Sequence, residues 1–600
     1  MLKHESFLIE KMKRILYTFF FFCLAVVAQA QKLKEEPVPK WAAKVQKSIV
    51  SVLTYNQKNE LLHRGVGVYI GRDGQVIASY ALFCDAYSAQ IVDFEGRKYP
   101  IERVLGASDV YGMAKVKATI QKNPFLPLTS LSEVQKNEKV YILGYSKNKY
   151  VSCPSTVVAK TDTVENQFAY YTLGNAFDSI YDGDILFDAK GQLLGLMLPS
   201  IGGQGYAIDA CLSSELKINA IHSKLTGIAL QKIHIPKAIP DTPEEALVYL
   251  YFQSKTASND DYLDMVNLFV RTYPENAEGY YRRATPLLDL HRFDEAASDL
   301  DTYLKLAGNK MVAHSNVAQT ITSKLLYQPN PVYEKWTYDL ALSHVNQALE
   351  MAEKQLSQAT TDSLREVSKA TIVEYKLQKA QVMMGKKDYH GAISVYDEIN
   401  AGPYRSASTF LASSLAHEAA HDSIGVQIAM MDSALSCFYK PLPRDAANYV
   451  MRRAKLFSAA KLYKKSVLDY NTYAMLMGDQ LNDAFYYDRA MVELEGRMYQ
   501  LALNDLDKAI EVMPREPLYH VEKSALYLRV GEIDKCIDAA RESISLDSAN
   551  SDAYRILGYA LLQKGDKINA RKNLEKAKSL GDESSEELIE KYFPHTPQSK

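Results

Sequence analysis

Four aspartates lie close together in one stretch of the chain and could hold a cation. They are Asp178, Asp182, Asp184 and Asp188. Carboxylate oxygens are ligands that Ca²⁺ prefers. Their spacing does not match the calcium loop of EF-hand proteins. The pattern therefore favours a solvated acidic loop, and we expect neither a metal nor a cofactor.

Cysteines are the next residues that could act as metal ligands or nucleophiles. Five of them follow the apolar N-terminal run: Cys84, Cys153, Cys211, Cys437 and Cys536. None belongs to a CxxC pair, which argues against a zinc site and against a disulfide framework. One bridge within the N-terminal domain remains open as an alternative.

Cys84 could act as a nucleophile only beside a base such as histidine. The β-rich region around it contains two histidines, His63 and His222, and neither belongs to a common motif with Cys84. Free cysteine is among the most buried residue types, so a small buried side chain is the preferred interpretation of Cys84 and of Cys536.

Short runs of alternating apolar and polar residues, separated by turns, fill the chain from Trp41 to about Lys224. The clearest runs are 65–70, 75–79, 89–94, 97–105, 140–144, 151–159, 168–173, 185–188 and 193–198. No helix-length periodic segment occurs before Leu212. The pattern predicts an all-β domain over residues 38–224.

Four pieces of this domain, taken in order, resemble the trypsin-like serine proteases, and most closely their bacterial HtrA-like branch. Gly65 to Ile70 is similar to the Gly-x-Gly strand before the catalytic histidine, and Asp109 to Lys117 to the strand after the catalytic aspartate. Residues 184–196 are similar to the hairpin after the nucleophile, and Gly205 to Ile208 to the closing strand before a final helix. The resemblance implies a double β-barrel.

The same resemblance, carried over position by position, implies that the catalytic triad is absent. The histidine position falls on Ala81, the aspartate position on Gly112 and the serine position on Asp182. None of these side chains can serve as base, orienting acid or nucleophile in that mechanism. A carboxylate at the nucleophile position would also repel the oxyanion that backbone N–H groups stabilise. These degenerate positions predict a domain that does not hydrolyse peptide bonds.

A different alignment keeps an active peptidase open as the alternative hypothesis. An insertion of three residues would place Asp178 and Ser179 at the nucleophile position. The base would still be missing, because neither His63 nor His222 lies on the strand and loop where the family holds it. The missing histidine favours the inactive interpretation.

The C-terminal part of the chain repeats with a step of 34 residues. Each unit opens with an aromatic ring, at Tyr486, His520 and Tyr554, and small residues follow at fixed positions. Small side chains let two helices approach closely, and a period of this length is typical of stacked helix pairs. The pattern resembles the tetratricopeptide (TPR) repeat. The small positions are Ala490, Ser524 and Gly558, then Ala502, Cys536 and Ala570.

The helical region begins after a proline-rich linker. Prolines at 236, 240 and 243 predict a linker over residues 225–241, and Thr242 is a good cap for a helix that starts at Pro243. We predict TPR-like helical repeats over residues 242–592 and a tail over 593–600. Within them, residues 309–366 and 406–438 are expected to form longer helices that fall out of register.

The TPR resemblance also implies a concave groove, lined by the first helix of each pair, that binds proteins or peptides. Carried over position by position, it implies five groove residues, with inter-helix packing of the rings as the alternative. They are Tyr281, Tyr487, Met491, Arg555 and Tyr559.

The N-terminus carries the features of an export signal. Lys13 and Arg14 precede the apolar run 15–28, and Ala28-Gln29-Ala30 is a small-x-small cleavage site. We therefore expect a signal peptide over residues 1–30, with Met12 as an alternative start, and no transmembrane segment after its removal. Localisation in the periplasm or cell envelope of a bacterium follows, with a lipid anchor at Cys23 as the weaker alternative.

The length and the charge balance of the chain limit the number of domains and the kind of partner. A chain of 600 residues is too long for one core, and the balance of 70 basic against 72 acidic residues argues against nucleic-acid binding. The predicted fold is multidomain: an all-β trypsin-like double β-barrel followed by an all-α TPR solenoid. The predicted function is that of an exported, non-enzymatic protein-interaction scaffold, and an active peptidase with TPR repeats is the alternative.

Overall fold

The computed structural model describes residues 37–128, 134–146, 152–165, 167–176, 179–220 and 229–593. The predicted signal peptide and all but the first residue of the predicted tail lie outside these ranges. The chain divides into two compact units, residues 1–308 and 309–600. The first unit contains the strands and helices α2 to α6, and the second contains helices α7 to α21.

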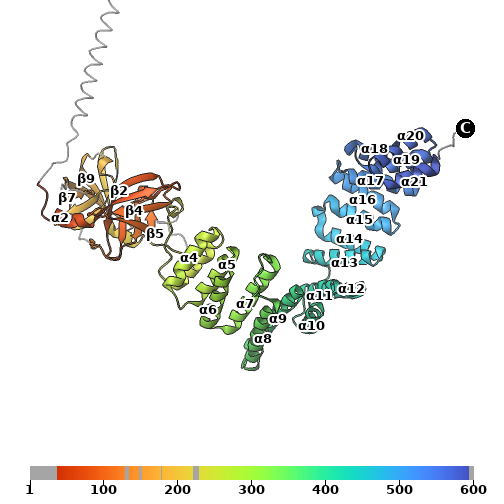
Figure 1. The fold of residues 1–600 in the computed structure, drawn as a ribbon, viewed down its shortest axis with the longest axis horizontal. Coiled ribbons are helices and arrows are strands. Elements are labelled where there is room, and N and C mark those ends of the chain that lie inside the picture. The colour runs from red at the N-terminus through yellow and green to blue at the C-terminus, as the bar shows by residue number, and fades with distance from the viewer. Residues whose placement is uncertain are drawn as a thin grey trace, which may run out of the picture. The chain divides into compact units, whose positions relative to one another are not determined.

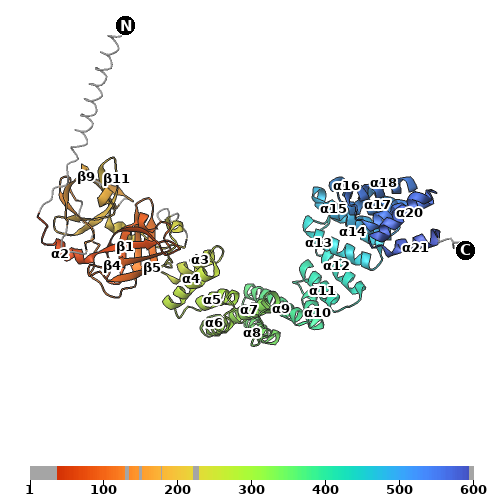
Figure 2. The same cartoon turned by 45° about the horizontal axis from the view of Figure 1, so that its top comes forward.

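Six antiparallel strands close the first barrel (Figure 1). They pair in the order β1-β2-β3-β6-β5-β4, and β4 closes the barrel on β1 with Val52 opposite Ile91. Figure 2 shows β1, β4 and β5 side by side. The strands are β1 (Ile49–Tyr55), β2 (Leu61–Tyr69), β3 (Gln75–Ser79), β4 (Ser88–Val92), β5 (Lys98–Ser108) and β6 (Met113–Ala118).

A second barrel of six antiparallel strands follows, paired in the order β10-β11-β12-β9-β8-β7. Strand β10 is apolar throughout its first three residues because Leu186 faces one hydrophobic core while Ile185 and Phe187 face another. The strands are β7 (Lys139–Leu143), β8 (Ser155–Val164), β9 (Phe168–Ala176), β10 (Ile185–Asp188), β11 (Leu193–Ile201) and β12 (Gln204–Asp209).

Two details of the β region differ from the sequence-based expectation. Strand β1 was not predicted, although its β-branched run Ile49-Val50-Ser51-Val52 is typical of a strand. The final helix implied by the trypsin-like resemblance is not found in the described residues after β12, where a short 3₁₀ turn spans Ala210–Ser214. The side chain of Asp209 caps that turn by accepting from the Cys211 N–H, at 2.8 Å.

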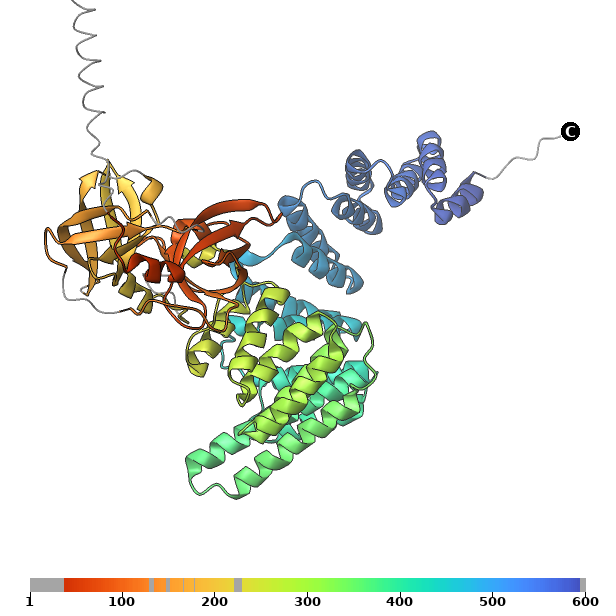
Figure 3. The ribbon, with the colours of Figure 1, turned by 60° about the vertical axis from the view of Figure 1, so that its left-hand side comes forward.

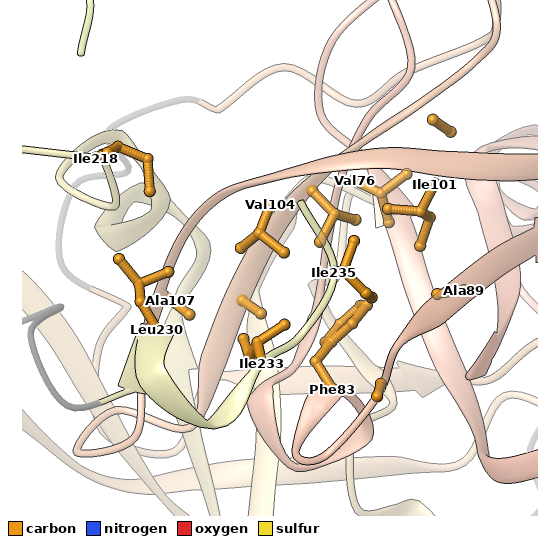
Figure 4. Close-up of a cluster of buried hydrophobic side chains, with 14 of the residues drawn as sticks. Val76, Phe83, Ala89, Ile101, Val104, Ala107, Ile218, Leu230, Ile233 and Ile235 are labelled. Atoms are coloured by element: carbon orange, nitrogen blue, oxygen red, sulfur yellow. The ribbon is translucent and has the colours of Figure 1, made fainter. Parts of the chain in front are cut away.

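The segment after residue 228 packs directly on the first barrel. Ile233 and Ile235 are buried beside Phe83 and Val104, as Figure 4 shows. The backbone of Val104 donates to the Pro236 carbonyl and accepts from Ala238, both at 2.9 Å. The part of the expected linker that the structure describes is therefore a component of the first hydrophobic core.

The first helices are attached to the same barrel. Helix α3 (Pro243–Gln253) begins as predicted, because the Thr242 side chain accepts from the Glu245 N–H and proline occupies the first turn. The guanidinium of Arg103 on β5 forms two hydrogen bonds to the carboxylate of Asp264 on α4 (Asn259–Thr272), at 2.8 and 3.0 Å. Helices α5 (Ala277–Asp289) and α6 (Phe293–Leu306) complete the first unit.

The second unit is a succession of antiparallel helices, coloured from green to blue in Figures 1 and 3. The bounds are α7 (Lys310–Tyr327), α8 (Tyr338–Ser357), α9 (Asp362–Lys386), α10 (Tyr389–Ala401), α11 (Ala407–Ala419), α12 (Ile424–Ser436), α13 (Ala447–Ala459), α14 (Tyr463–Met477), α15 (Asp483–Glu495), α16 (Tyr499–Val512), α17 (Pro517–Val530), α18 (Ile533–Leu546), α19 (Ser551–Gln563), α20 (Lys567–Ser579) and α21 (Glu583–Tyr592).

Longer helices were expected in two segments of the array, and the structure contains them in one of the two. Helices α7, α8 and α9 have 18, 20 and 25 residues, as the irregular sequence of that region predicts. Residues 406–438 do not form longer helices, because α11 and α12 have 13 residues each. The expectation for that segment was wrong: short helices suffice there, since serines and alanines fill the small positions. No helix in the described residues is long and apolar enough to cross a membrane.

The small residues of the 34-residue period lie where paired helices touch. The side chains of Ala490, Ala502, Ser524, Cys536 and Ala570 are fully buried, with no solvent-exposed area. A Cβ added at Gly558 would lie 2.8 Å from Cγ of Leu574 and 3.1 Å from the Ala570 carbonyl. The small positions therefore set how closely α19 and α20 approach.

Buried arginine–aspartate pairs join the two helices of several repeats. Arg489 on α15 forms a bidentate pair with Asp505 on α16, and both side chains are at least nine-tenths buried. In each pair the arginine and the aspartate are sixteen residues apart in the sequence. Each arginine also donates to one further polar side chain. A buried charge requires such a partner. The other pairs are Arg283 with Asp299 and Arg453 with Asp469.

We expect Gly558→Leu to destabilise the second unit by about 1–3 kcal/mol, because the new side chain would overlap Leu574. Thermal unfolding followed by far-ultraviolet circular dichroism measures the change. Gly425→Leu is the matched control, since the nearest atom to an added Cβ there is Ser423 Oγ at 3.9 Å. Equal melting temperatures for the two variants would show that position 558 does not limit helix approach.

Candidate functional site

The three positions that the trypsin-like resemblance assigns to a triad, Ala81, Gly112 and Asp182, come close together between the two barrels. The backbone N–H of Tyr80, next to Ala81, donates to the carbonyl of Gly112 at 2.9 Å. A Cβ added at Gly183, next to Asp182, would lie 3.6 Å from Cβ of Ser79. The loop after β3, the turn before β6 and the loop before β10 therefore meet at one place.

The side chains at this meeting point do not form a triad. Ala81 and Asp182 are exposed and Gly112 is half-buried with a φ of 62°. The positive φ of Gly112 suits its place in a tight turn, where a Cβ would lie 3.0 Å from Leu198. The side chains of Ala81 and Gly112 carry no group that could accept a proton.

The backbone N–H and the carboxylate of Asp182 both form hydrogen bonds within the protein. Its N–H donates to the Ser179 carbonyl at 3.1 Å. Its carboxylate Oδ1 accepts from the backbone N–H of Ser200 on β11, at 3.2 Å. An N–H that is already bonded within its loop cannot also stabilise an oxyanion without breaking that bond. The arrangement therefore removes one backbone donor of the loop and one of β11 from any ligand.

Asp184 lies beside Asp182 in the same loop. Burial, together with the negative charge of Asp182, raises the pKa of Asp184 to about 7. Gly144 provides the room, because a Cβ there would lie 2.9 Å from Asp184 Oδ1. The Gly144 carbonyl in turn accepts from Nε2 of Gln46, at 3.2 Å. A carboxyl group with a raised pKa is a candidate functional group, although Asp184 lines none of the described pockets.

The remaining candidates for catalysis are not assembled into a site. Ser179 begins a 3₁₀ turn in the loop that carries Asp182, whereas Asp178 and His222 lie outside the described residues. His63 is on β2, opposite Thr54 of β1. The Cys84 thiol donates to the Tyr80 carbonyl, with Sγ 3.9 Å from the oxygen.

Sequence reasoning missed one histidine near Cys84. His234 follows the expected end of the β domain, yet its ring stacks on Tyr87 with the centroids 4.3 Å apart. The backbone N–H of His234 donates to the Ala86 carbonyl at 2.9 Å. No hydrogen bond joins this ring to Cys84 in the described residues. A pattern search confined to residues 38–224 could not have found this contact.

The acidic stretch is not a metal centre in the part of the chain that the structure describes. No group of three or more His, Cys, Asp or Glu side chains is arranged to hold a metal ion among those residues. Asp188 instead stabilises the β10–β11 turn, where its Oδ1 accepts from the N–H groups of Lys190 and Gln192 at 2.8 and 2.7 Å.

The five predicted groove residues are half-buried, and most of them contact a neighbouring ring or charge. Tyr281 on α5 stacks on Tyr303, at 4.9 Å between centroids. Tyr281 belongs to the first unit. Those four lie in the second unit, on α15 and α19.

Within the second unit the groove candidates make the following contacts. The ring of Tyr487 lies 5.3 Å from that of Tyr519, and Met491 packs on the cluster around Ala490. Arg555 pairs with Asp552 and Asp582, and Tyr559 lies edge-on to Tyr592 at 6.3 Å. These contacts hold the side chains in place while leaving part of each exposed.

Comparison with known proteins finds relatives of the helical part. The chain is 32% identical over 72 residues to small glutamine-rich tetratricopeptide repeat-containing protein 2 of Mycosarcoma maydis, covering 12% of this chain and 20% of that protein. The protein of the same name from Saccharomyces cerevisiae is 28% identical over 95 residues, covering 16% and 28%.

A TPR repeat-containing protein of Methanocaldococcus jannaschii is 28% identical over 116 residues, covering 19% of each chain. The matched part of the chain therefore spans between 19% and 28% of the length of these relatives. No family model matches. The likeness supports TPR-type repeats within the helical solenoid.

Asp184 should make the stability of the first unit depend on pH. Its pKa is raised from 3.8 to about 7, so the folded state holds a proton between these values that the unfolded chain releases. This contribution to stability is present in full below pH 3.8 and is lost as pH rises through 7. We expect Asp184→Asn to raise the free energy of unfolding at pH 8 by roughly 2–4 kcal/mol and to have little effect at pH 4.

Urea unfolding followed by Trp41 fluorescence, in a Trp336→Phe background, measures this difference. The exposed Asp109→Asn is the control and should leave the pH dependence unchanged. An equal effect of Asp184→Asn at both pH values would mean that folding does not raise the pKa of residue 184.

Proposed function

We propose that this protein is a non-enzymatic protein-interaction scaffold, in which a trypsin-like β region without a triad is joined to a TPR array. The observation that carries the proposal is the meeting point of the three loops. They converge as a catalytic site requires, yet Ala81 and Gly112 bring no acid or base. Asp182 uses its N–H and its carboxylate within the protein.

The helical solenoid supplies the surface for partners. Tyrosine and arginine are enriched at protein interfaces, and Tyr487, Arg555 and Tyr559 keep part of their area accessible on the first helices of two repeats. TPR-containing relatives support a protein or peptide as the partner. The β region could add an extended peptide through main-chain groups, which needs no catalytic residue.

An active serine peptidase is the second candidate. The position of Ser179, three residues from Asp182 and in the same loop, is the observation that favours it. Such an enzyme would need a general base other than His63 and His222, the two histidines of the predicted domain. Labelling with a serine-reactive probe separates the two candidates.

We expect the purified protein neither to react with a fluorophosphonate probe nor to cleave unfolded casein. Ser179→Ala and Cys84→Ala are the matched variants, and an active trypsin preparation is the positive control. Covalent labelling, or cleavage that either substitution abolishes, would establish the peptidase instead.

We propose export as the second part of this function, on the basis of the N-terminal sequence alone. The native protein should begin near Gln31 and be found outside the cytoplasm. N-terminal sequencing of the protein isolated from its own cells tests this, with a cytoplasmic enzyme followed in the same fractions. A mature chain that begins at Met1 or Met12 would contradict export by this signal.

A further inference from the structure

A groove on the first unit combines apolar walls with a rim of lysines. It has a volume of about 620 Å³, and its lining includes α2 (Ala42–Val45), the segment 123–127 and the β10–β11 turn. None of the positions that correspond to the triad lies in it. Its apolar lining includes Trp41, Val45, Phe125, Leu126 and Leu193.

One wall of the groove is held by Trp41. The indole Nε1–H donates to the Ala189 carbonyl at 3.0 Å. The ring lies edge-on to Tyr141 and tilted against Phe187, with centroids 5.6 and 5.5 Å away. Gly191 packs flat on the indole, since a Cβ there would lie 2.6 Å from Trp41 Cδ2. The N-terminal helix is therefore tied to the β10–β11 turn.

The opposite wall is held by Asn123, which is buried. Its amide donates to the carbonyls of Gly71 and Pro124, at 2.8 and 2.9 Å, and accepts from the Gly74 N–H at 2.8 Å. The backbone N–H of Leu126 donates to the Tyr69 carbonyl at 2.9 Å. Both walls are thus fixed before any ligand arrives, which lowers the entropic cost of binding.

The charge around the groove is positive. Lys44, Lys47 and Lys190 line it, are exposed, and take part in no ion pair with another described residue. The guanidinium of Arg72 lies 5.4 Å from the centroid of the Phe125 ring. No acidic side chain is part of the lining, and the carboxylate of Asp188 is taken up by its own turn.

We propose that this groove binds an acidic peptide segment that carries an apolar side chain. The lysines would attract the carboxylates, and the apolar side chain would enter between Trp41 and Phe125. A concave site with two fixed walls suits an extended chain better than the flat surface of a membrane. This site is separate from the predicted TPR groove, and its test does not depend on the function proposed above.

Trp41 provides a direct readout of binding. The chain has two tryptophans, so Trp336→Phe leaves Trp41 as the sole indole in the full-length protein. The probe is the decapeptide Asp-Glu-Asp-Leu-Asp-Phe-Glu-Asp-Glu-Leu. We expect saturable change of Trp41 emission with this peptide, weakening as salt is raised. A counterpart with lysine at every acidic position should give no change.

Reversing the charge of the three groove lysines tests whether the peptide binds in the groove. We expect the triple variant Lys44→Glu, Lys47→Glu, Lys190→Glu to weaken binding about tenfold or more. The control carries Lys58→Glu, Lys98→Glu and Lys136→Glu, which are exposed lysines of the same unit outside the groove. Equal loss in both triple variants, no response of Trp41 to the acidic peptide, or a response to phosphatidylglycerol vesicles in place of the peptide would overturn the proposal.

Discussion

Close approach of two chain segments, possible only where a side chain is small or absent, is the constraint on which both units depend. In the second unit, alanine, serine, cysteine and glycine occupy the small positions of the 34-residue period, and Gly558 leaves no room for a Cβ against Leu574. In the first unit, Gly191 lies flat on Trp41 and Gly144 makes room for Asp184. Close packing of this kind is stabilising because it maximises dispersion contacts, and it leaves little tolerance for added atoms.

Among the described residues, buried charged groups either pair with an opposite charge or have a shifted pKa, as at Asp184 and Glu493. The array buries arginines only beside aspartates, at the same spacing in each case, as with Arg489 and Asp505. Asp184 has no such cation, and its neighbour Asp182 carries the same charge. The protein therefore accommodates it by raising its pKa rather than by pairing. An ionisable group of this kind at the junction of two barrels links the stability of the β region to pH near neutrality.

The loops of the β region meet as they would in a catalytic site, but their side chains have other roles. The loops meet, but Asp182 ties its loop to Ser200 on β11. Binding surfaces remain available elsewhere: the Trp41 groove on the barrels and the half-buried rings of the solenoid. A protein built in this way is suited to holding other chains rather than to cutting them, which is the function that we propose.

The sequence by itself determined those features that depend on neighbours along the chain. The 34-residue period, the small positions, the Thr242 cap and most strands follow from local spacing and could be read directly. The double-barrel class was implied by the trypsin-like resemblance, and the structure contains two closed barrels. The tertiary structure alone decided which distant residues meet. It placed His234 on Tyr87, Ile233 and Ile235 in the first core, and the carboxylate of Asp182 on Ser200. These contacts join residues far apart in sequence, and they form only when the barrels close, so no local pattern encodes them.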